Sequence, residues 1–172
     1  MTDPEFTRMI RARPSPPPRA AIEASETERA ALAIRFGVSA LETLRAECTF
    51  EPDSGAVKAT GTLSAVVVQT CAVSVEDFTV RIDEPLHLRF VQQARAVDPE
   101  DEAELPGDEP DEIEFAGDSF DLGEAVAQSL GLAIDPYAEG PKADAARKEV
   151  GVIDESAPRG PLADLLAGLK RS

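Results

Sequence analysis

The chain has 172 residues, of which 42% are hydrophobic and 29% charged, and its formal net charge is −16. This length favours one folded domain, and the lack of Trp with a single Tyr implies a core of aliphatic residues and a few Phe. The acidic balance argues against the basic patch that marks most nucleic-acid-binding domains. No apolar stretch approaches the roughly 18 residues of a membrane span, so we expect no contact with a membrane.

The cysteine content and the N-terminus indicate the compartment. Cys48 and Cys71 are the only cysteines. Residues 1–10 lack the apolar core of a secretory signal. Isolated cysteines without such a signal are typical of free thiols in a reducing compartment, so we expect a cytoplasmic protein.

Residues 1–20 are rich in proline and arginine. The prolines fix an extended backbone without N–H donors, which predicts a flexible arm. One interpretation is a simple leader. The other is a basic arm that contacts a phosphate backbone, because no acidic residue interrupts the arginines. The candidate RNA-contacting residues are Arg8, Arg11, Arg13 and Arg19.

A helix is predicted after this arm. Ser25 and Glu28 have the spacing of a capping box, and Gly37 can end the helix in a left-handed conformation. The spacing of Val38, Leu41 and Leu44 then predicts a second, short amphipathic turn.

Alternating apolar and polar residues predict strands from about Cys48 to Val91. Turn residues occupy positions 52–55, and Pro85 predicts a break between two later strands. The inward sets that we expect are Leu63, Ala65 and Val67; Phe78, Val80 and Ile82; and Leu86, Leu88 and Phe90.

The net charge is concentrated in one tract. Twelve Asp or Glu and no Lys or Arg lie between Asp98 and Asp121. Like-charge repulsion and low hydrophobicity predict a disordered or long loop over residues 98–111. A short strand around Ile113 and Phe115 should follow, and Asp121 can cap a helix that ends before Pro136.

These patterns together predict an α+β fold: a curled antiparallel sheet of five to seven strands with a few flanking helices. The domain should span residues 21–137. Residues 138–160 are predicted to be a linker, and residues 161–172 a short C-terminal helix that begins at Pro161.

The residues suggest little catalytic chemistry. His87 is the only histidine, so a site with two histidine ligands is excluded, and no cysteine cluster has zinc spacing. A pairing of His87 with Cys48 or Cys71 would be needed for a cysteine nucleophile. No glycine-rich phosphate loop is present. We therefore expect no enzyme, no metal and no cofactor.

Two segments carry a resemblance to a known family. The first is Gly61-Thr-Leu followed by an apolar strand and Cys71-Ala-Val-Ser-Val-Glu76; the second runs from Phe120-Asp-Leu-Gly-Glu to Leu-Gly-Leu-Ala-Ile-Asp-Pro136. In this order they resemble the YceD family, named for accumulation of large-subunit ribosomal RNA. The family-motif positions are Gly61, Cys71, Ser74, Glu76, Asp121, Leu122, Glu124, Leu130, Leu132 and Pro136. Members commonly have Cys where this chain has Ser74, so a metal or redox role is not carried over.

The resemblance implies a non-catalytic accessory factor in 23S rRNA accumulation or processing and large-subunit assembly. Its implied partners are ribosomal RNA or large-subunit assembly intermediates, contacted directly or through a basic ribosomal protein. One alternative is an acidic interaction protein that shields a basic ribosomal protein. The other is a cysteine-dependent enzyme.

Overall fold

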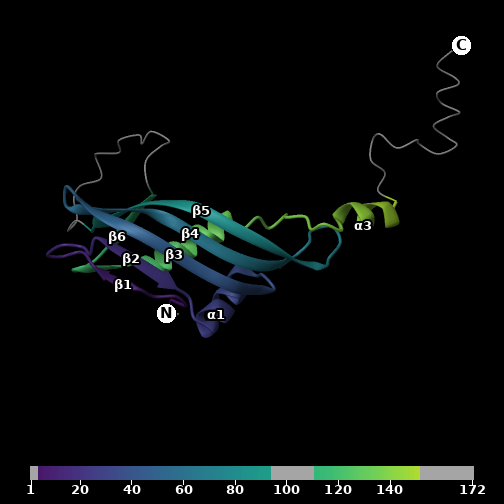
Figure 1. Ribbon diagram of the computed structural model, residues 1–172, viewed down its shortest axis with the longest axis horizontal. Coiled ribbons are helices and arrows are strands. Elements are labelled where there is room, and N and C mark those ends of the chain that lie inside the picture. The colour runs from purple at the N-terminus through teal and green to yellow at the C-terminus, as the bar shows by residue number, and fades with distance from the viewer. Residues whose placement is uncertain (1–3, 94–110, 152–172) are drawn as a thin grey trace, which may run out of the picture.

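The computed structural model describes residues 4–93 and 111–151. Its strands are β1 (Met9–Arg11), β2 (Arg19–Glu23), β3 (Ala40–Asp53), β4 (Ala56–Thr70), β5 (Asp77–Gln92), β6 (Asp111–Phe115) and β7 (Ser119–Asp121). Its helices are α1 (Glu26–Phe36), α2 (Leu122–Ala133) and α3 (Ala143–Glu149). Figure 1 shows a long, twisted sheet with α1 at one side and α3 beyond one end.

The main sheet has five strands in the order β2-β3-β4-β5-β6, and β1 pairs with β7 in a separate two-stranded sheet. This confirms the predicted α+β class. One pairing differs from the expected antiparallel sheet, because β6 runs parallel to the end of β5. A parallel pair needs a long connection, and the chain between Gln92 and Asp111 has the length for it.

The predicted first helix is confirmed. The Ser25 side chain accepts from the Glu28 backbone N–H while the Glu28 carboxylate accepts from the Ser25 N–H, which completes the capping box. Gly37 has φ 66° and ends the helix in the left-handed region.

The predicted helical turn over residues 38–44 is wrong. This stretch enters β3, which begins at Ala40, well before the predicted start at Cys48. The register shifts between Leu41 and Thr43. A bulge adds one residue to a strand, so Leu41 and Leu44 share the buried face although they are three apart. A spacing of three is also typical of one face of a helix, which is why the sequence predicted a helical turn here.

The following hairpin agrees with the turn prediction. Ser54 and Gly55 both have positive φ between β3 and β4, as a tight hairpin turn requires. Leu63, Ala65 and Val67 are fully buried on one face, as predicted. The predicted break at Pro85 is wrong, because β5 continues through it and Pro85 lies opposite Thr62.

The inner face of the sheet packs under α2 and forms the core. Asp121 caps this helix by accepting from the Glu124 N–H, as predicted. Phe120 lies at the centre of the aromatic residues, with its ring stacked at 3.9 Å from that of Phe90. Phe50 and Phe115 meet the same ring edge-on.

Within the described residues, parts of the expected arm and of the expected linker form regular structure. Met9–Arg11 pairs with β7, and Phe6 is fully buried in the core. Residues 143–149 form α3 inside the expected linker. The acidic loop up to residue 110 and the C-terminal helix lie outside the described residues, whereas Asp111 begins β6.

Candidate functional site

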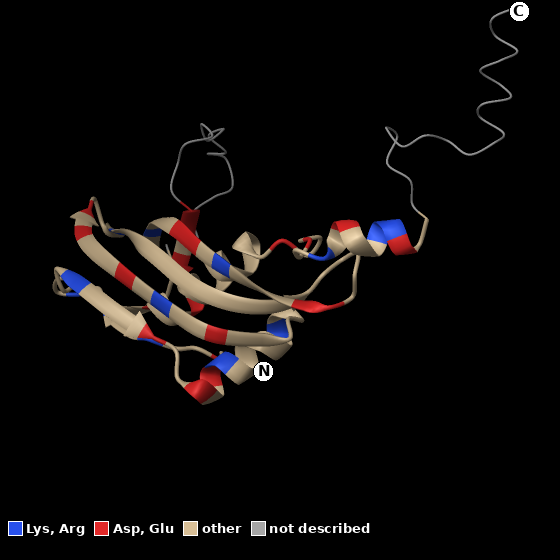
Figure 2. Ribbon diagram, turned by 45° about the vertical axis from the view of Figure 1, so that its right-hand side comes forward, with Lys and Arg blue, Asp and Glu red and all other residues tan. Residues whose placement is uncertain are grey.

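The face of the sheet that points away from α2, hereafter the outer face, is polar and open. On β3 and β4, buried residues alternate with exposed or half-buried ones, so every second side chain points outward. Figure 2 shows acidic and basic residues interspersed over this sheet. The outward hydroxyl residues of the central strands are Thr49, Thr60, Thr62 and Ser64.

A hollow of about 740 Å³ lies over β2, β3 and β4. Two cross-strand rows line it. Arg19, Thr49 and Thr60 form one row, and the next contains Ala21, Glu47 and Thr62. The Thr49 hydroxyl lies 3.1 Å from that of Thr60. The hollow therefore offers hydroxyls, one guanidinium and one carboxylate to a polar ligand.

Gly61 between these rows permits an unusually close approach of β3. A Cβ at this position would lie 1.9 Å from the backbone oxygen of Glu47 and 2.8 Å from the Cα of Cys48. No side chain fits at these distances, so this family-motif residue shapes the sheet and lines the hollow with its backbone alone.

Of the four candidate arginines, Arg8 is held inside the fold. Its guanidinium donates to both carboxylate oxygens of Glu28, at 2.7 and 2.9 Å, and to the backbone oxygen of Glu23. It also lies over the ring of Phe6. This ion pair raises the pKa of Arg8 and lowers the pKa of Glu28 to about 2. Arg8 therefore closes the N-terminal segment onto α1.

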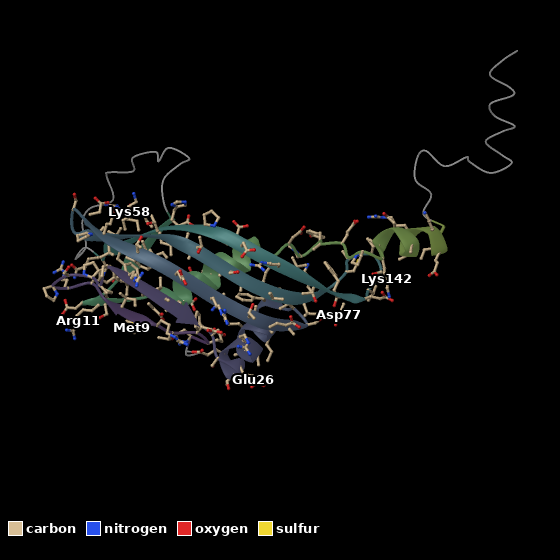
Figure 3. All side chains as sticks on the ribbon, viewed as in Figure 1. Met9, Arg11, Glu26, Lys58, Asp77 and Lys142 are labelled. Carbon is tan, nitrogen blue, oxygen red and sulfur yellow. The ribbon has the colours of Figure 1, made fainter. Side chains whose placement is uncertain are left out.

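The other three arginines lie at the surface. Arg11 and Arg19 are exposed, and Arg19 lines the hollow. Arg13 is exposed and donates to the side chain of Gln92. Figure 3 places Arg11 at the same end of the sheet as Lys58, which points outward two residues before Thr60. We call Arg11, Arg13, Arg19 and Lys58 the basic end of the molecule. Acidic residues lie at this end too, since Glu51 is opposite Lys58 and both Asp53 and Glu112 pair with Arg89.

Cys71 lies at the opposite end, in the turn between β4 and β5. Its Sγ accepts from three backbone N–H groups, those of Val73, Ser74 and Gly140, at 3.2 to 3.4 Å. Hydrogen bonds from Ser74 and then from Gly140 lower the pKa of the Cys71 thiol to about 7. Burial instead raises the pKa of the Cys48 thiol to about 11. Cys71 is thus the more readily ionised thiol.

The turn offers no obvious partner for this thiol. Ser74 occupies the position of a second cysteine, and within residues 4–93 and 111–151 no three His, Cys, Asp or Glu side chains are grouped to hold a metal. His87 is exposed on the outer face opposite Thr60, ten residues along β4 from Thr70. At about 3.3 Å per residue this separates His87 from the Cys71 turn by roughly 30 Å.

The remaining motif positions hold the fold together. Asp121 accepts from the Arg8 backbone N–H at 2.8 Å as well as capping α2. Glu124 pairs with Arg35, and Glu76 pairs with Lys142. Leu122 and Leu130 are buried in the core. Pro136 follows α2, whereas the Leu132 side chain is 84% exposed.

Sequence reasoning missed two contributors. At Gly123 a Cβ would lie 2.5 Å from the backbone oxygen of Phe6, so the N-terminal segment crosses the first turn of α2 at close range. The sequence signal for this close approach was a glycine inside a predicted helix, because such a glycine often has a packing reason. Gly140, which donates to the Cys71 sulfur, is 69 residues away in the chain and gave no local signal.

The fold and site define a small α+β domain built on one open sheet, with a polar outer face and a packed inner face. The chain belongs to the family described as large ribosomal RNA subunit accumulation protein YceD, whose family model matches residues 59–160. Searches of curated proteins and of solved structures gave no match. None of the helices in the described part of the chain is long and apolar enough to span a membrane.

Proposed function

We propose that this protein is a non-catalytic accessory factor in 23S rRNA accumulation or processing during assembly of the large ribosomal subunit. The observation that carries the proposal is the family match over residues 59–160. We place this activity in the cytoplasm, where the free thiols of Cys48 and Cys71 fit a reducing environment.

The basic end of the molecule is our candidate for direct RNA contact. An acidic protein is repelled by a phosphate backbone unless local cations face it. Arg11, Arg13 and Arg19 supply such cations, and Arg19 lines the hollow that bears hydroxyl groups, whereas Arg8 is occupied by Glu28. Three phosphate contacts alone give weak binding, and each contact adds roughly 0.7 to the steepness of the logarithmic salt dependence on single strands and roughly 0.9 on a B-form duplex.

The test is crosslinking to ribosomal RNA in cells, followed by binding to the crosslinked fragment over a salt series. Replacing Arg11, Arg13 and Arg19 with Gln should weaken binding and flatten its salt dependence. A matched control replaces Lys142, Arg147 and Lys148 with Gln, which removes the same charge at the other end. Equal affinity and slope for both variants would exclude the basic end.

The charge distribution supports a second candidate, an acidic protein that shields a basic ribosomal protein. The net charge of −16 attracts cationic partners, and the sequence places twelve acidic residues between Asp98 and Asp121. Salt-sensitive binding to basic ribosomal proteins that is lost when residues 98–109 are deleted would favour this function. Recruitment through such a protein would also bring the chain to ribosomal RNA.

The cysteine-dependent enzyme has less support. Cys71 has a lowered pKa but lies about 30 Å along the sheet from His87, so a Cys-His pair of the usual kind is not formed. Cells that carry only the Cys71→Ser variant should accumulate 23S rRNA normally. Loss of function in that variant, with the fold intact, would favour the enzyme.

A further inference from the structure

Strand β5 has a free edge along most of its length. On one side it pairs with β4 over all residues from Asp77 to Val91. On its other side β6 covers only Leu88–Gln92. Within the described part of the chain, residues 77–87 therefore have no strand beside them. Gly140 packs on the Phe78 side chain and Pro85 has no N–H, and the other outward backbone groups can pair with an added strand.

A groove lies next to this edge. It encloses about 300 Å³ between the middle of β5 and the end of α2. Its apolar residues are Pro85, Leu86, Leu88, Leu132 and Ala133. Leu86 and Leu88 are buried, whereas Leu132 is 84% exposed, which is unusual for a leucine beside a core. The groove can therefore receive apolar side chains from a strand added at the edge.

The charges of the groove are all of one sign. Glu84 and Asp111 line it together with His87 and Ser129, and no Lys or Arg does so. Both carboxylates are exposed. Glu84 lies opposite Leu63, which is an inward residue of β4, so Glu84 also occupies an inward position of β5. Its carboxylate therefore lies on the α2 side of the edge. An occupant of this groove must bring positive charge.

We propose that the free edge of β5 and this groove form a docking site for an extended basic segment of a partner protein, bound by strand addition. Backbone hydrogen bonds to residues 77–87 hold the segment, its apolar side chains pack on Leu132 and Ala133, and its Lys or Arg side chains face Glu84 and Asp111. The site does not depend on RNA binding at the basic end.

Charge complementarity selects this occupant over two others. A second copy of the chain would bring its own Glu84 against the groove carboxylates, because Arg81, the one Lys or Arg of residues 77–87, is paired with Asp83, and like charges at an edge oppose self-pairing. The chain's own segment at residues 98–109 carries seven acidic residues and no basic one, so the groove carboxylates repel it.

The experiment uses a labelled peptide of repeated Lys-Thr-Val-Thr as the probe, so that Lys and Val share the face that meets the groove, and the full chain as the receptor. Fluorescence anisotropy measures affinity over a salt series. Amide hydrogen exchange measures protection along β5. We expect the peptide to protect amides within residues 77–87 while leaving those of β2 unchanged. A peptide of the same sequence, N-methylated on alternate backbone amides, should bind at least about tenfold more weakly because it cannot complete the strand ladder.

Two pairs of variants locate the site. Glu84→Lys should lower the affinity for the peptide about tenfold. Glu149→Lys makes the same charge change in α3 and should leave this affinity within about twofold of the wild-type value. Leu132→Ser should weaken peptide binding severalfold. Ile34→Ser alters an equally exposed side chain of α1 and should leave peptide binding unchanged. Neither Glu84 nor Leu132 supports the core, so all four variants should fold.

Several results would overturn the proposal. Equal affinity for Glu84→Lys and Glu149→Lys would mean non-specific charge attraction. Protection of the β5 edge in the free monomer would mean that the chain covers its own edge, and protection that grows with protein concentration would identify a second copy. An RNA oligonucleotide that protects residues 77–87 in place of the peptide would make this face an RNA site. None of these results bears on crosslinking to ribosomal RNA, so the proposed function is tested separately.

Discussion

On the inner face of the sheet, the residues of β3, β4 and β5 between Leu44 and Phe90 are mostly apolar and buried, whereas the same strands carry Thr, Ser, Arg, Lys and Glu on the outer face. Both faces come from one alternating sequence. The two sets of side chains therefore serve different purposes. The inner set determines whether the sheet folds under α2, and the outer set is free to face a ligand.

Glu84 marks where this division ends. It is a charged residue at an inward position of β5, and it lies beside the part of the edge that β6 does not cover. Charge at such a position is compatible with folding only because the groove there is open. The border between the faces is therefore the place where a partner strand can be accommodated.

The largest contrast between the faces is expected for Phe120→Ala. This ring is 1% exposed and contacts Phe50, Phe90 and Phe115. Its loss should lower the free energy of unfolding by about 3–5 kcal/mol. His87→Ala, on the outer face, should change it by less than about 0.5 kcal/mol. Urea denaturation of both variants measures the contrast, and similar losses would contradict the division into two faces.

Gly61→Ala comes next. The new Cβ would overlap the backbone of Glu47 and Cys48, so β3 and β4 must separate, at about 3 kcal/mol. Gly55→Ala is the control. That residue has φ 88° with open space around it, so only conformational strain of about 1 kcal/mol is expected. Equal effects in urea denaturation would mean that Gly61 serves only backbone flexibility.

Local signals made much of the fold predictable. The capping box at Ser25 and Glu28, the cap at Asp121 and the alternation through Leu63, Ala65 and Val67 each depend on residues close in sequence. The bulge after Leu41 hid the start of β3, because an added residue turns a strand's period of two into a helix-like spacing.

The candidate site was less predictable because its contacts join distant residues. Arg8 looked like a free cation in a proline-rich arm, but its partner Glu28 lies 20 residues away and Asp121 lies 113 away. Cys71 gave no sign of its Gly140 donor. Arg19 was identified from the sequence, whereas the hollow that it lines requires β2 and β3 to be paired.

The ion pair between Arg8 and Glu28 should have a smaller, pH-dependent effect. Glu28→Gln should lower the free energy of unfolding by about 1 kcal/mol at pH 7, since the pair is partly exposed. The folded pKa of Glu28, about 2, lies below its ordinary value of 4.5. Its contribution is therefore complete above pH 4.5 and is lost as pH falls toward 2.

Urea denaturation of wild type and Glu28→Gln between pH 7 and pH 2 checks this. The difference between them should shrink through that acid window. Glu26→Gln removes a neighbouring exposed carboxylate of the same helix turn and should cost no more than about 0.5 kcal/mol. A difference that persists unchanged at pH 2 would show that the carboxylate charge is not what stabilises the closure of the N-terminal segment.

The smallest effect on stability is expected for Cys71→Ser, because a serine oxygen can accept from the same N–H groups of Val73, Ser74 and Gly140. In the wild type the folded pKa of Cys71 is lowered to about 7 from 9. Its thiolate therefore contributes stability that is complete above pH 9 and is lost as pH falls through 7. Unfolding free energy should rise from pH 7 to pH 9 in wild type, and this rise should be weaker in Cys71→Ser. Ultraviolet absorbance of the thiolate supplies the direct measurement, because Cys71 and Cys48 are both buried and a labelling reagent would not reach either one in the folded protein. A thiolate signal that is absent in Cys71→Ser should appear with a midpoint near pH 7, while Cys48 stays protonated until near pH 11. A single midpoint at the ordinary thiol pKa of 9 would mean that the three N–H donors do not hold the thiolate, and the turn would then be a structural element alone.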